Sequence, residues 1–279
     1  MSSSSSSYLA GALDTVATRW DEVSAMLAVA NSMDESSLER QTICRATVVM
    51  LSSHFEGSLR MIAQAISNDL NESYSFAELP TPLKRGFVQD GLIRVDTEAK
   101  KLGQVISRVV DLLGTTNVMI SDSFFLDRRG NPTVKEVNSI GQYFGVDKVC
   151  SWFVGSKMED VFKNDRAWAA QYAKRLATST RKNVEAFPYS LHPERYQLRK
   201  NSGLGTSLFE TFIENFLQRR HDLAHGRGLG TPAKSVREIQ DDLRKVQLLI
   251  YGFVLVVGNK VSEGRQTPLI IGGTVEEES

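Results

Sequence analysis

The sequence predicts an all-α fold, a helical bundle formed mainly by one domain. Apolar residues recur every three or four positions along most of the chain, whereas the alternation typical of β-strands is hard to find. Serine, proline and glycine interrupt these runs where helices would begin and end. With 279 residues, 41% of them hydrophobic, the chain is long enough to bury a substantial core. We therefore expect a helical globular protein.

The first helices are predicted by long apolar stripes and by the residues that interrupt them. A stripe over residues 9–30 indicates the first helix, and Ser36 or Ser37 can cap the second. Pro80 and Pro82 then break the pattern before the next helical segment. The expected helices cover about residues 9–30, 38–70, 97–113, 132–144, 166–185, 205–225 and 235–261.

The later elements follow the same signals. Pro132 suits the first turn of a short helix that Gly145 stops. Residues 166–185 indicate a basic helix with a polar face, and residues 188–200 indicate a loop rich in arginine, histidine and lysine. The apolar spacing is clearest in the last two helices.

The two ends of the chain differ from the helical part in composition. Residues 1–8 are rich in serine with no basic region, so we expect a disordered leader and not a secretory signal. Residues 9–262 form the expected helical domain, with residues 166–204 as a candidate insertion, and residues 263–279 form a flexible tail. Two distant cysteines and no apolar run of transmembrane length favour a cytoplasmic protein without membrane contact.

The most informative segment is Gln218–Gly226, at the expected end of the helix over residues 205–225. It places Arg220 and His225 beside Gly226, which stops the helix and leaves the histidine in its last turn. The negative end of the helix dipole favours a protonated imidazole there. On an ideal helix the arginine and the histidine lie roughly 140° apart around the axis. A bent arginine side chain or a second subunit would therefore be needed to bring them together.

These residue types suit the cleavage of RNA without a metal. RNA carries its own nucleophile, the 2′-hydroxyl, so the enzyme must move protons and stabilise a crowded phosphorane. We assign His225 to proton transfer because imidazole titrates near neutral pH. We assign Arg220 to the phosphate because its planar guanidinium binds two oxygens and stays charged. His221 and Asp222 would orient or tune these two residues.

The segment Arg220–Gly226 resembles the Arg-x4-6-His signature of the HEPN superfamily (higher eukaryotes and prokaryotes nucleotide-binding domains). A second stretch, Met50–Leu59 with His54 and Glu56, is similar to the aromatic-Glu-Gly helix of bacterial stand-alone HEPN proteins. Residues 131–145 are similar to the short helix between these two motifs. The three matches occur in the expected order along the chain.

The resemblance implies a HEPN-like helical bundle that dimerises, so that two arginine–histidine pairs meet in one cleft. It also implies metal-independent RNA cleavage, often in toxin–antitoxin or phage-defence systems, with an antitoxin or another defence protein as partner. Glu56, His54 and Arg219 are the auxiliary site candidates. The chain departs from the family at His221, where asparagine or aspartate is usual. It also carries Arg227 where toxins silenced by a nucleotidyltransferase have tyrosine.

Contacts with RNA would have to come from local basic patches, because the net charge of the chain is zero. Arg227, Arg199 and Lys200 are the RNA-binding candidates, and Lys174–Arg175 and Arg181–Lys182 add further cations. There is no phosphate-binding glycine loop with a lysine and no zinc-finger spacing. We therefore expect no cofactor and no metal.

Other interpretations of the same residues stay open. The arginines could form a solvated face with His225 as a helix cap, in an inactive HEPN module that binds RNA, a nucleotide or a protein partner. His221 and His225, one turn apart, could instead hold a metal in a hydrolase, although a third ligand would be needed. His54 could be a core histidine, and Glu56 could simply pair with Arg60 one turn later.

Overall fold

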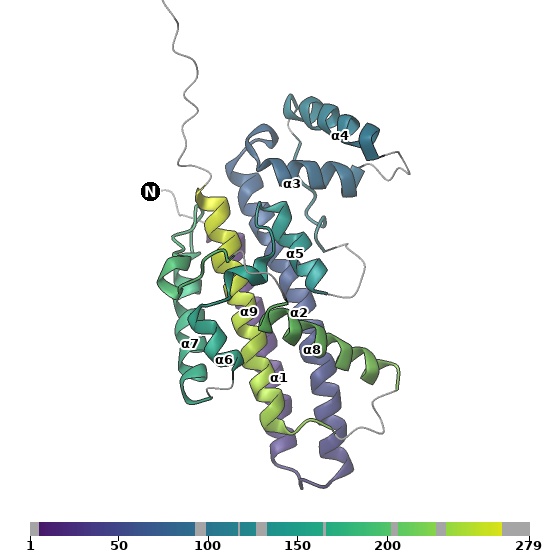
Figure 1. Cartoon of the computed structure of the whole chain (residues 1–279), viewed down its shortest axis with the longest axis vertical. Coiled ribbons are helices and arrows are strands. Elements are labelled where there is room, and N and C mark those ends of the chain that lie inside the picture. The colour runs from purple at the N-terminus through teal and green to yellow at the C-terminus, as the bar shows by residue number, and fades with distance from the viewer. Residues whose placement is uncertain are drawn as a thin grey trace, which may run out of the picture.

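The fold is described by a computed structural model for residues 6–92, 99–116, 118–126, 133–163, 166–201, 206–226 and 233–263. Within these ranges all regular elements are helices, which confirms the predicted all-α class (Figure 1). The α-helices are α1 (Tyr8–Asn31), α2 (Leu38–Ser73), α3 (Thr81–Gly86), α4 (Ala99–Gly114), α5 (Val134–Tyr143), α6 (Lys157–Phe162), α7 (Arg166–Asn183), α8 (Leu208–Ala224) and α9 (Val236–Glu263). The short helices are η1 (Phe76–Glu78), η2 (Phe87–Leu92), η3 (Val149–Trp152) and η4 (Pro193–Tyr196).

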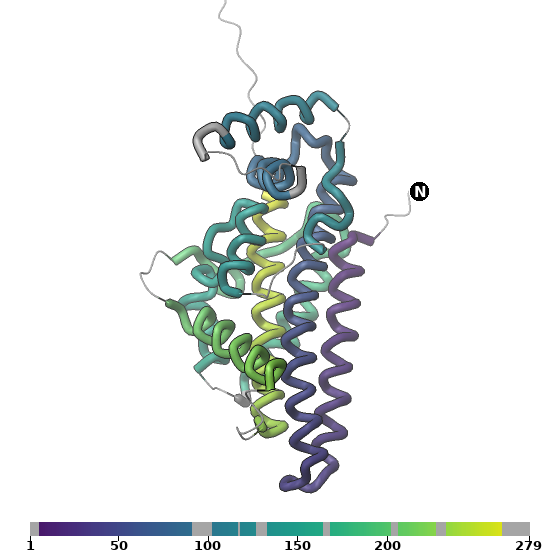
Figure 2. The backbone as a smooth tube through the Cα atoms, turned by 90° about the vertical axis from the view of Figure 1, so that its right-hand side faces the viewer, coloured from purple at the N-terminus to yellow at the C-terminus, as the bar shows by residue number. Residues whose placement is uncertain are grey.

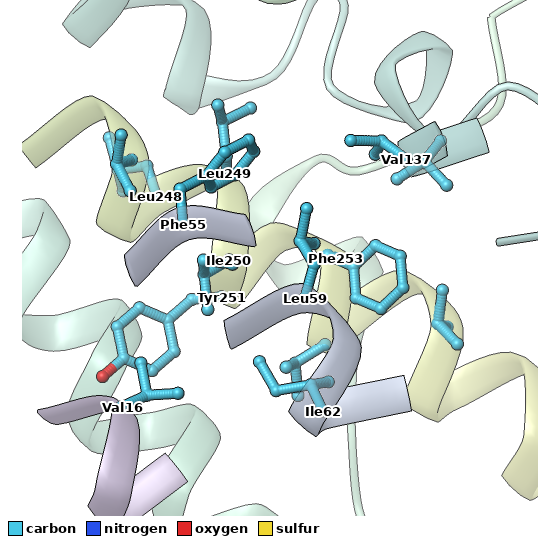
Figure 3. Close-up of a cluster of buried hydrophobic side chains, with 14 of the residues drawn as sticks. Val16, Phe55, Leu59, Ile62, Val137, Leu248, Leu249, Ile250, Tyr251 and Phe253 are labelled. Carbon is cyan, nitrogen blue, oxygen red and sulfur yellow. The ribbon is translucent and has the colours of Figure 1, made fainter. Parts of the chain in front are cut away.

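The centre of the bundle is formed by α1, α2 and α9. α1 and α2 run antiparallel from a short turn, and α9 packs against both (Figures 1 and 2). Apolar side chains from the three helices meet between them, among them Val16, Phe55, Leu59 and Phe253 (Figure 3). A fully buried side chain of this size contributes on the order of 1.5–3 kcal/mol. This cluster is therefore the main source of stability.

α9 is buried along most of its length because its neighbours cover it on several sides. α1 and α2 pack on one side, and α7 packs on another. By length and composition alone, α9 is the helix among the described residues that could cross a membrane. However, 72% of its most apolar window is buried inside the bundle. Packing against other helices therefore accounts for its apolar sequence.

The candidate insertion, residues 166–204, contributes to the same core as far as the structure describes it. α7 packs along α9, and the loop that follows is held by Tyr189, whose hydroxyl donates a hydrogen bond to Asp69 Oδ2 at 2.6 Å. Asp69 also accepts hydrogen bonds from the backbone N–H groups of the first two residues of α1, at 2.8 and 3.0 Å. This buried carboxylate joins the start of α1, the end of α2 and the loop after α7.

The first helix begins earlier than the sequence predicts. Ser7 caps α1, since its Oγ accepts a hydrogen bond from the N–H of Ala10 at 3.0 Å. Ser7 is itself buried, and its N–H donates to a carbonyl oxygen after α7 at 2.9 Å. Ser7 and Tyr8, the last two residues of the expected leader, thus belong to the folded part. The rest of the expected tail and leader, residues 264–279 and 1–5, lies outside the described residues.

A smaller layer at one end of the bundle is formed by α3, η2 and α4 (Figure 1). The sequence predicts α4 closely but no helix at α3, because Pro80 and Pro82 resemble a break. Pro82 instead occupies the first turn of α3, where the missing N–H would have no helical partner anyway. A proline pair after a long helix can therefore begin the next helix as well as end the last one.

Candidate active site

The candidate site lies at the C-terminal end of α8. Ser207 caps the start of this helix: its Oγ accepts from the Glu210 N–H at 3.2 Å, and the Glu210 carboxylate accepts from the Ser207 N–H at 2.8 Å. The helix ends at Ala224, and His225 takes the C-cap position. Gly226 follows with a φ of 72°, a left-handed value that favours glycine. The helix therefore ends beside His225, as the sequence predicts.

α8 is held in place through one apolar face. Phe209, Ile213 and Phe216 are buried. The ring of Phe209 contacts those of Phe153 and Phe162, with centroids 5.4 and 4.6 Å apart. α8 also packs against α2 and α5. This one-sided packing leaves much of the last two turns facing solvent.

Arg220 is half-buried on α8 and lies near the carboxylate of Glu56 on α2. Burial raises the pKa of Glu56; the cations Arg60 and Arg220 oppose this rise, and the neighbouring Glu136 of α5 adds to it. Glu56 Oε1 lies 2.8 Å from Arg60 Nη2, so the ion pair one turn apart is present. Three helices thus bring two arginines and two glutamates together beside the candidate site.

His221 and His225 lie together at the end of the helix. Their ring centroids are 4.3 Å apart, with the planes inclined by 56°. His225 is exposed, and its backbone N–H donates to the carbonyl oxygen of His221 at 3.1 Å. Asp222 does not contact these rings here, because its Oδ1 accepts a hydrogen bond from Gln218 Nε2 at 2.9 Å. The two imidazoles are therefore the groups that can meet a ligand at this end.

Arg219 faces a different part of the molecule from Arg220. The pKa of Glu238, on the first turn of α9, is lowered mainly by hydrogen bonds from Ser235, with Arg219 adding to the effect. Burial raises the pKa of Asp242 on the same helix, and nearby cations, Arg219 among them, oppose that rise. Arg219 therefore links α8 to the first two turns of α9.

His54 lies in a separate environment between α2 and α1. Its Nε2 is 3.1 Å from Glu22 Oε2. Burial lowers the pKa of His54; Glu22 opposes this change and Arg19 adds to it. Gly57 lies on the same interface, where an added Cβ would stand 2.9 Å from Arg19 Nη1. Of this motif, Glu56 is the residue that turns toward α8, because successive residues on a helix point about 100° apart.

Glu136 is a neighbour of the site that the sequence analysis does not identify. It lies in the first turn of α5, where its N–H donates to Thr133 Oγ1 at 3.2 Å. In the sequence, a glutamate three residues after a threonine indicates only a helix start. The packing of α5 against α2 and α8 brings Glu136 near Glu56. Asn131 and Pro132, at the start of this motif, lie outside the described residues.

The RNA-binding candidates are distributed over several parts of the chain. Arg199 and Lys200 are exposed, and the backbone N–H of Arg199 donates to the Trp152 carbonyl at 3.2 Å. The basic helix α7 lies across α9 from the C-terminal end of α8 (Figure 1). Arg227 lies outside the described residues. Within one chain, the cations of α7 are therefore not adjacent to Arg220.

A metal centre on His221 and His225 would need at least one further ligand. In the part of the chain that the structure describes, no group of three or more His, Cys, Asp or Glu side chains could hold a metal ion. Cys44 and Cys150 are buried, and burial raises the pKa of both thiols, to about 12 for Cys150. The chemistry available at the end of α8 is therefore that of imidazole, guanidinium and carboxylate groups.

Comparison with known proteins gives one match. Residues 14–259 match a protein-family model described as RiboL-PSP-HEPN, and this range extends from α1 to the end of α9. No curated protein and no solved structure matches the chain. The match confirms the resemblance of the chain to the HEPN superfamily and indicates a nuclease or other RNA-related function.

Proposed function

We propose that this chain, which belongs to the RiboL-PSP-HEPN family, is a metal-independent endoribonuclease. One observation carries the proposal: at the end of α8, His225 is exposed beside His221, while Arg220 lies less than two turns away and near Glu56. Two groups that transfer protons and one that binds phosphate oxygens are thus held on one short helical segment.

In the proposed reaction the 2′-hydroxyl of the substrate attacks the adjacent phosphorus. His225 accepts the proton of this hydroxyl as the new P–O bond forms. The P–O5′ bond then breaks, and a second imidazole protonates the departing oxygen; His221, with its ring centroid 4.3 Å away, is the nearest candidate. The products are a 2′,3′-cyclic phosphate and a 5′-hydroxyl.

Arg220 would stabilise the negative charge that builds up on the phosphorane. A preorganised donor of this kind contributes about 3–4 kcal/mol to the lowering of the barrier. Glu56 would act as a positioning residue, because its carboxylate lies near Arg220 and is held by Arg60 at 2.8 Å. The glutamate would thereby keep the guanidinium in a constant orientation before RNA binds.

We further propose that two copies of the chain pair at this site. Arg220 lies near the Glu56 carboxylate of α2, whereas His225 is exposed at the helix end, so a second copy could supply the imidazole or guanidinium that one copy holds too far away. The family resemblance supports such a homodimer. On that resemblance we also propose a cytoplasmic toxin or phage-defence effector, with an antitoxin or another defence protein as partner.

The alternative is an inactive HEPN module that binds RNA, a nucleotide or a protein partner. One observation favours it: Glu56 lies close to Arg220, so part of its charge is already balanced within the fold. An arginine engaged in this way could serve mainly to join α2 and α8.

The test is to incubate the purified protein with total cellular RNA in EDTA, beside the Arg220→Ala and His225→Ala variants. Arg219→Ala is the matched control, because this neighbouring arginine faces the start of α9. We expect discrete fragments ending in 2′,3′-cyclic phosphate from the wild type and the control. Each of the two site variants should lose at least about 100-fold in rate.

Circular dichroism and size-exclusion chromatography would show that all variants remain folded. Unchanged cleavage by folded His225→Ala would rule out the mechanism. Intact RNA in every reaction, with RNA still bound by the wild type, would favour the inactive module.

A further inference from the structure

A groove begins between the start of α9 and the turn that joins α1 to α2, and continues between α1 and α7, with α9 as the floor of its first two cavities. It consists of three adjoining cavities of about 540, 430 and 710 Å³. Gln240 and Arg244 border both the first and the second cavity, and Lys174 and Ala177 border both the second and the third. Because neighbouring cavities share lining residues, the three lie in a row, here called the α7–α9 groove.

Basic residues outnumber acidic residues along the α7–α9 groove by six to four. Three of the acidic side chains form ion pairs within it: Glu35 with Arg40 at 3.7 Å, Asp241 with Arg244 at 2.8 Å, and Asp14 with Arg181. The other three cations, Lys174 and Lys182 on α7 and Arg237 on α9, are exposed, and so is the fourth acidic residue, Glu185. The groove therefore presents a positive surface along its length.

The composition of its walls fits a polyanion better than a peptide. Between its first and last residues α7 carries no acidic side chain. Several alanines on the two sides of the groove, Ala10, Ala170 and Ala177 among them, allow a sugar–phosphate backbone to approach closely. From Arg237 to Tyr251 the floor extends along α9 for roughly 21 Å, at 1.5 Å per residue. That length suits several consecutive phosphates of an extended strand.

One end of the groove is linked to α8, the helix that ends at the candidate site, along the chain and through Arg219. Arg237 is in the first turn of α9, at the far end of the connection that leaves the site at Gly226. Arg219 of α8 acts electrostatically on Glu238, the residue next to Arg237. α7 lies on one side of α9, and the end of α8 lies on the other side (Figure 1). A strand leaving the groove at Arg237 would pass around the start of α9 toward His225.

We propose that the α7–α9 groove binds the backbone of single-stranded RNA and delivers the strand to the end of α8. This inference rests on the proposed ribonuclease function for the fate of the strand, but binding itself does not depend on cleavage. Lys174, Lys182 and Arg237 contact phosphates, so affinity is independent of sequence and falls as salt rises. The groove thus selects single strands, and the site at α8 carries out the chemistry.

The binding test uses a fluorescent 2′-O-methyl single strand, which lacks the nucleophile and cannot be cleaved. The variant is the triple substitution Lys174→Ala, Lys182→Ala and Arg237→Ala, measured in the full-length protein over a range of salt concentrations. We expect Kd to rise at least about tenfold. The slope of log Kd against log salt should fall by about 2, since each single-strand phosphate contact contributes about 0.7.

The matched control removes the same charge from exposed cations elsewhere, by Arg108→Ala, Lys157→Ala and Lys260→Ala together. Its Kd and salt slope should stay those of the wild type. Equal Kd and slope for the groove variant and the wild type would overturn the proposal, and so would displacement of RNA by an acidic polypeptide at lower concentration than by unlabelled RNA.

Cleavage assays separate this proposal from the proposed function. With a long RNA, the groove variant should raise KM and leave kcat unchanged, while a dinucleotide should be cleaved as by the wild type. If the groove binds RNA but the protein does not cleave it, the proposal of the groove holds and the proposal of a ribonuclease is wrong. If the groove variant cleaves long RNA with the same KM as the wild type, the proposal of the groove is wrong and the proposal of a ribonuclease holds.

Discussion

Two regions of this molecule each contain an arginine, a histidine and a glutamate, with opposite consequences. Between α1 and α2, His54 lies 3.1 Å from Glu22 and close to Arg19, and its side chain is only 18% exposed. At the end of α8, His225 is exposed, and Arg220 lies near a glutamate of α2. The first group closes an interface, whereas the second leaves proton-transferring groups in contact with solvent. Residue types alone therefore do not mark a site.

The difference comes from where each group sits on its helix. His54 lies within the 36-residue α2, with α1 packed along it. His225 stands exposed at the C-cap, and Gly226 follows with a left-handed φ. A helix end is thus where a fold can keep charged groups oriented without burying them.

The largest difference between the two regions should appear when each arginine becomes lysine. Arg220→Lys keeps the charge but loses the planar fork, so we expect RNA cleavage to fall by on the order of 100-fold. Arg19→Lys should cleave RNA like the wild type, because this side chain lies at the interface of α1 and α2. Initial rates on one labelled RNA measure both. Equal rates for Arg220→Lys and the wild type would contradict a bidentate phosphate contact.

A matched pair of glycine substitutions should separate the closed interface from open surface. Gly57→Leu would push against Arg19 Nη1, only 2.9 Å from the position of an added Cβ, and should lower the free energy of unfolding by about 1–3 kcal/mol. Gly11 on α1 has no atom within 4 Å of that position. Gly11→Leu should therefore leave stability unchanged or raise it by up to about 1 kcal/mol. Urea unfolding followed by circular dichroism measures both, and equal losses would show that the space at Gly57 is not limiting.

Glu56→Gln should separate activity from stability at the site. Burial raises the pKa of Glu56 and so disfavours its charged form in the fold. This cost lowers the free energy of unfolding, and it is present in full once the pH exceeds the folded pKa. Glutamine removes that cost together with the attraction to Arg60 and Arg220, so we expect little net change in the free energy of unfolding. RNA cleavage should fall by about tenfold as Arg220 loses its orientation. A large loss of stability with normal cleavage would make Glu56 a structural residue only.

The smallest expected effect is on the pH dependence of stability. Burial lowers the pKa of His54, so the unfolded chain takes up this proton more readily than the folded one. Neutral His54 makes its full contribution to the free energy of unfolding above the unfolded pKa of about 6.5. This contribution is lost as the pH falls through the lower pKa of the folded state. His54→Gln should weaken the loss of stability between pH 7.5 and pH 5.5 in urea unfolding, whereas His225→Gln should retain it. Identical pH profiles for His54→Gln and the wild type would show that His54 does not cause this loss of stability.

Much of the fold could be predicted because its signals are local. The stripe from Leu9, the cap at Ser37 and the stop at Gly226 predict helix boundaries within a few residues of those observed. The helix α3 could not be predicted in this way, because the prolines at its start equally suit a break. The role of residues 166–201 in the core also depends on contacts with α9 and α2 that no local pattern reveals.

The sequence by itself determined the helices, the end of α8 and the presence of Arg220 and His225 there, since periodicity and capping act within a few residues. Only the tertiary structure decided which motif residues meet. It turned His54 toward α1 and Glu56 toward α8, and it brought Glu136 from α5 to the same place. The physical reason is that neighbours on a helix point about 100° apart. What each one contacts is therefore decided by the packing of distant helices.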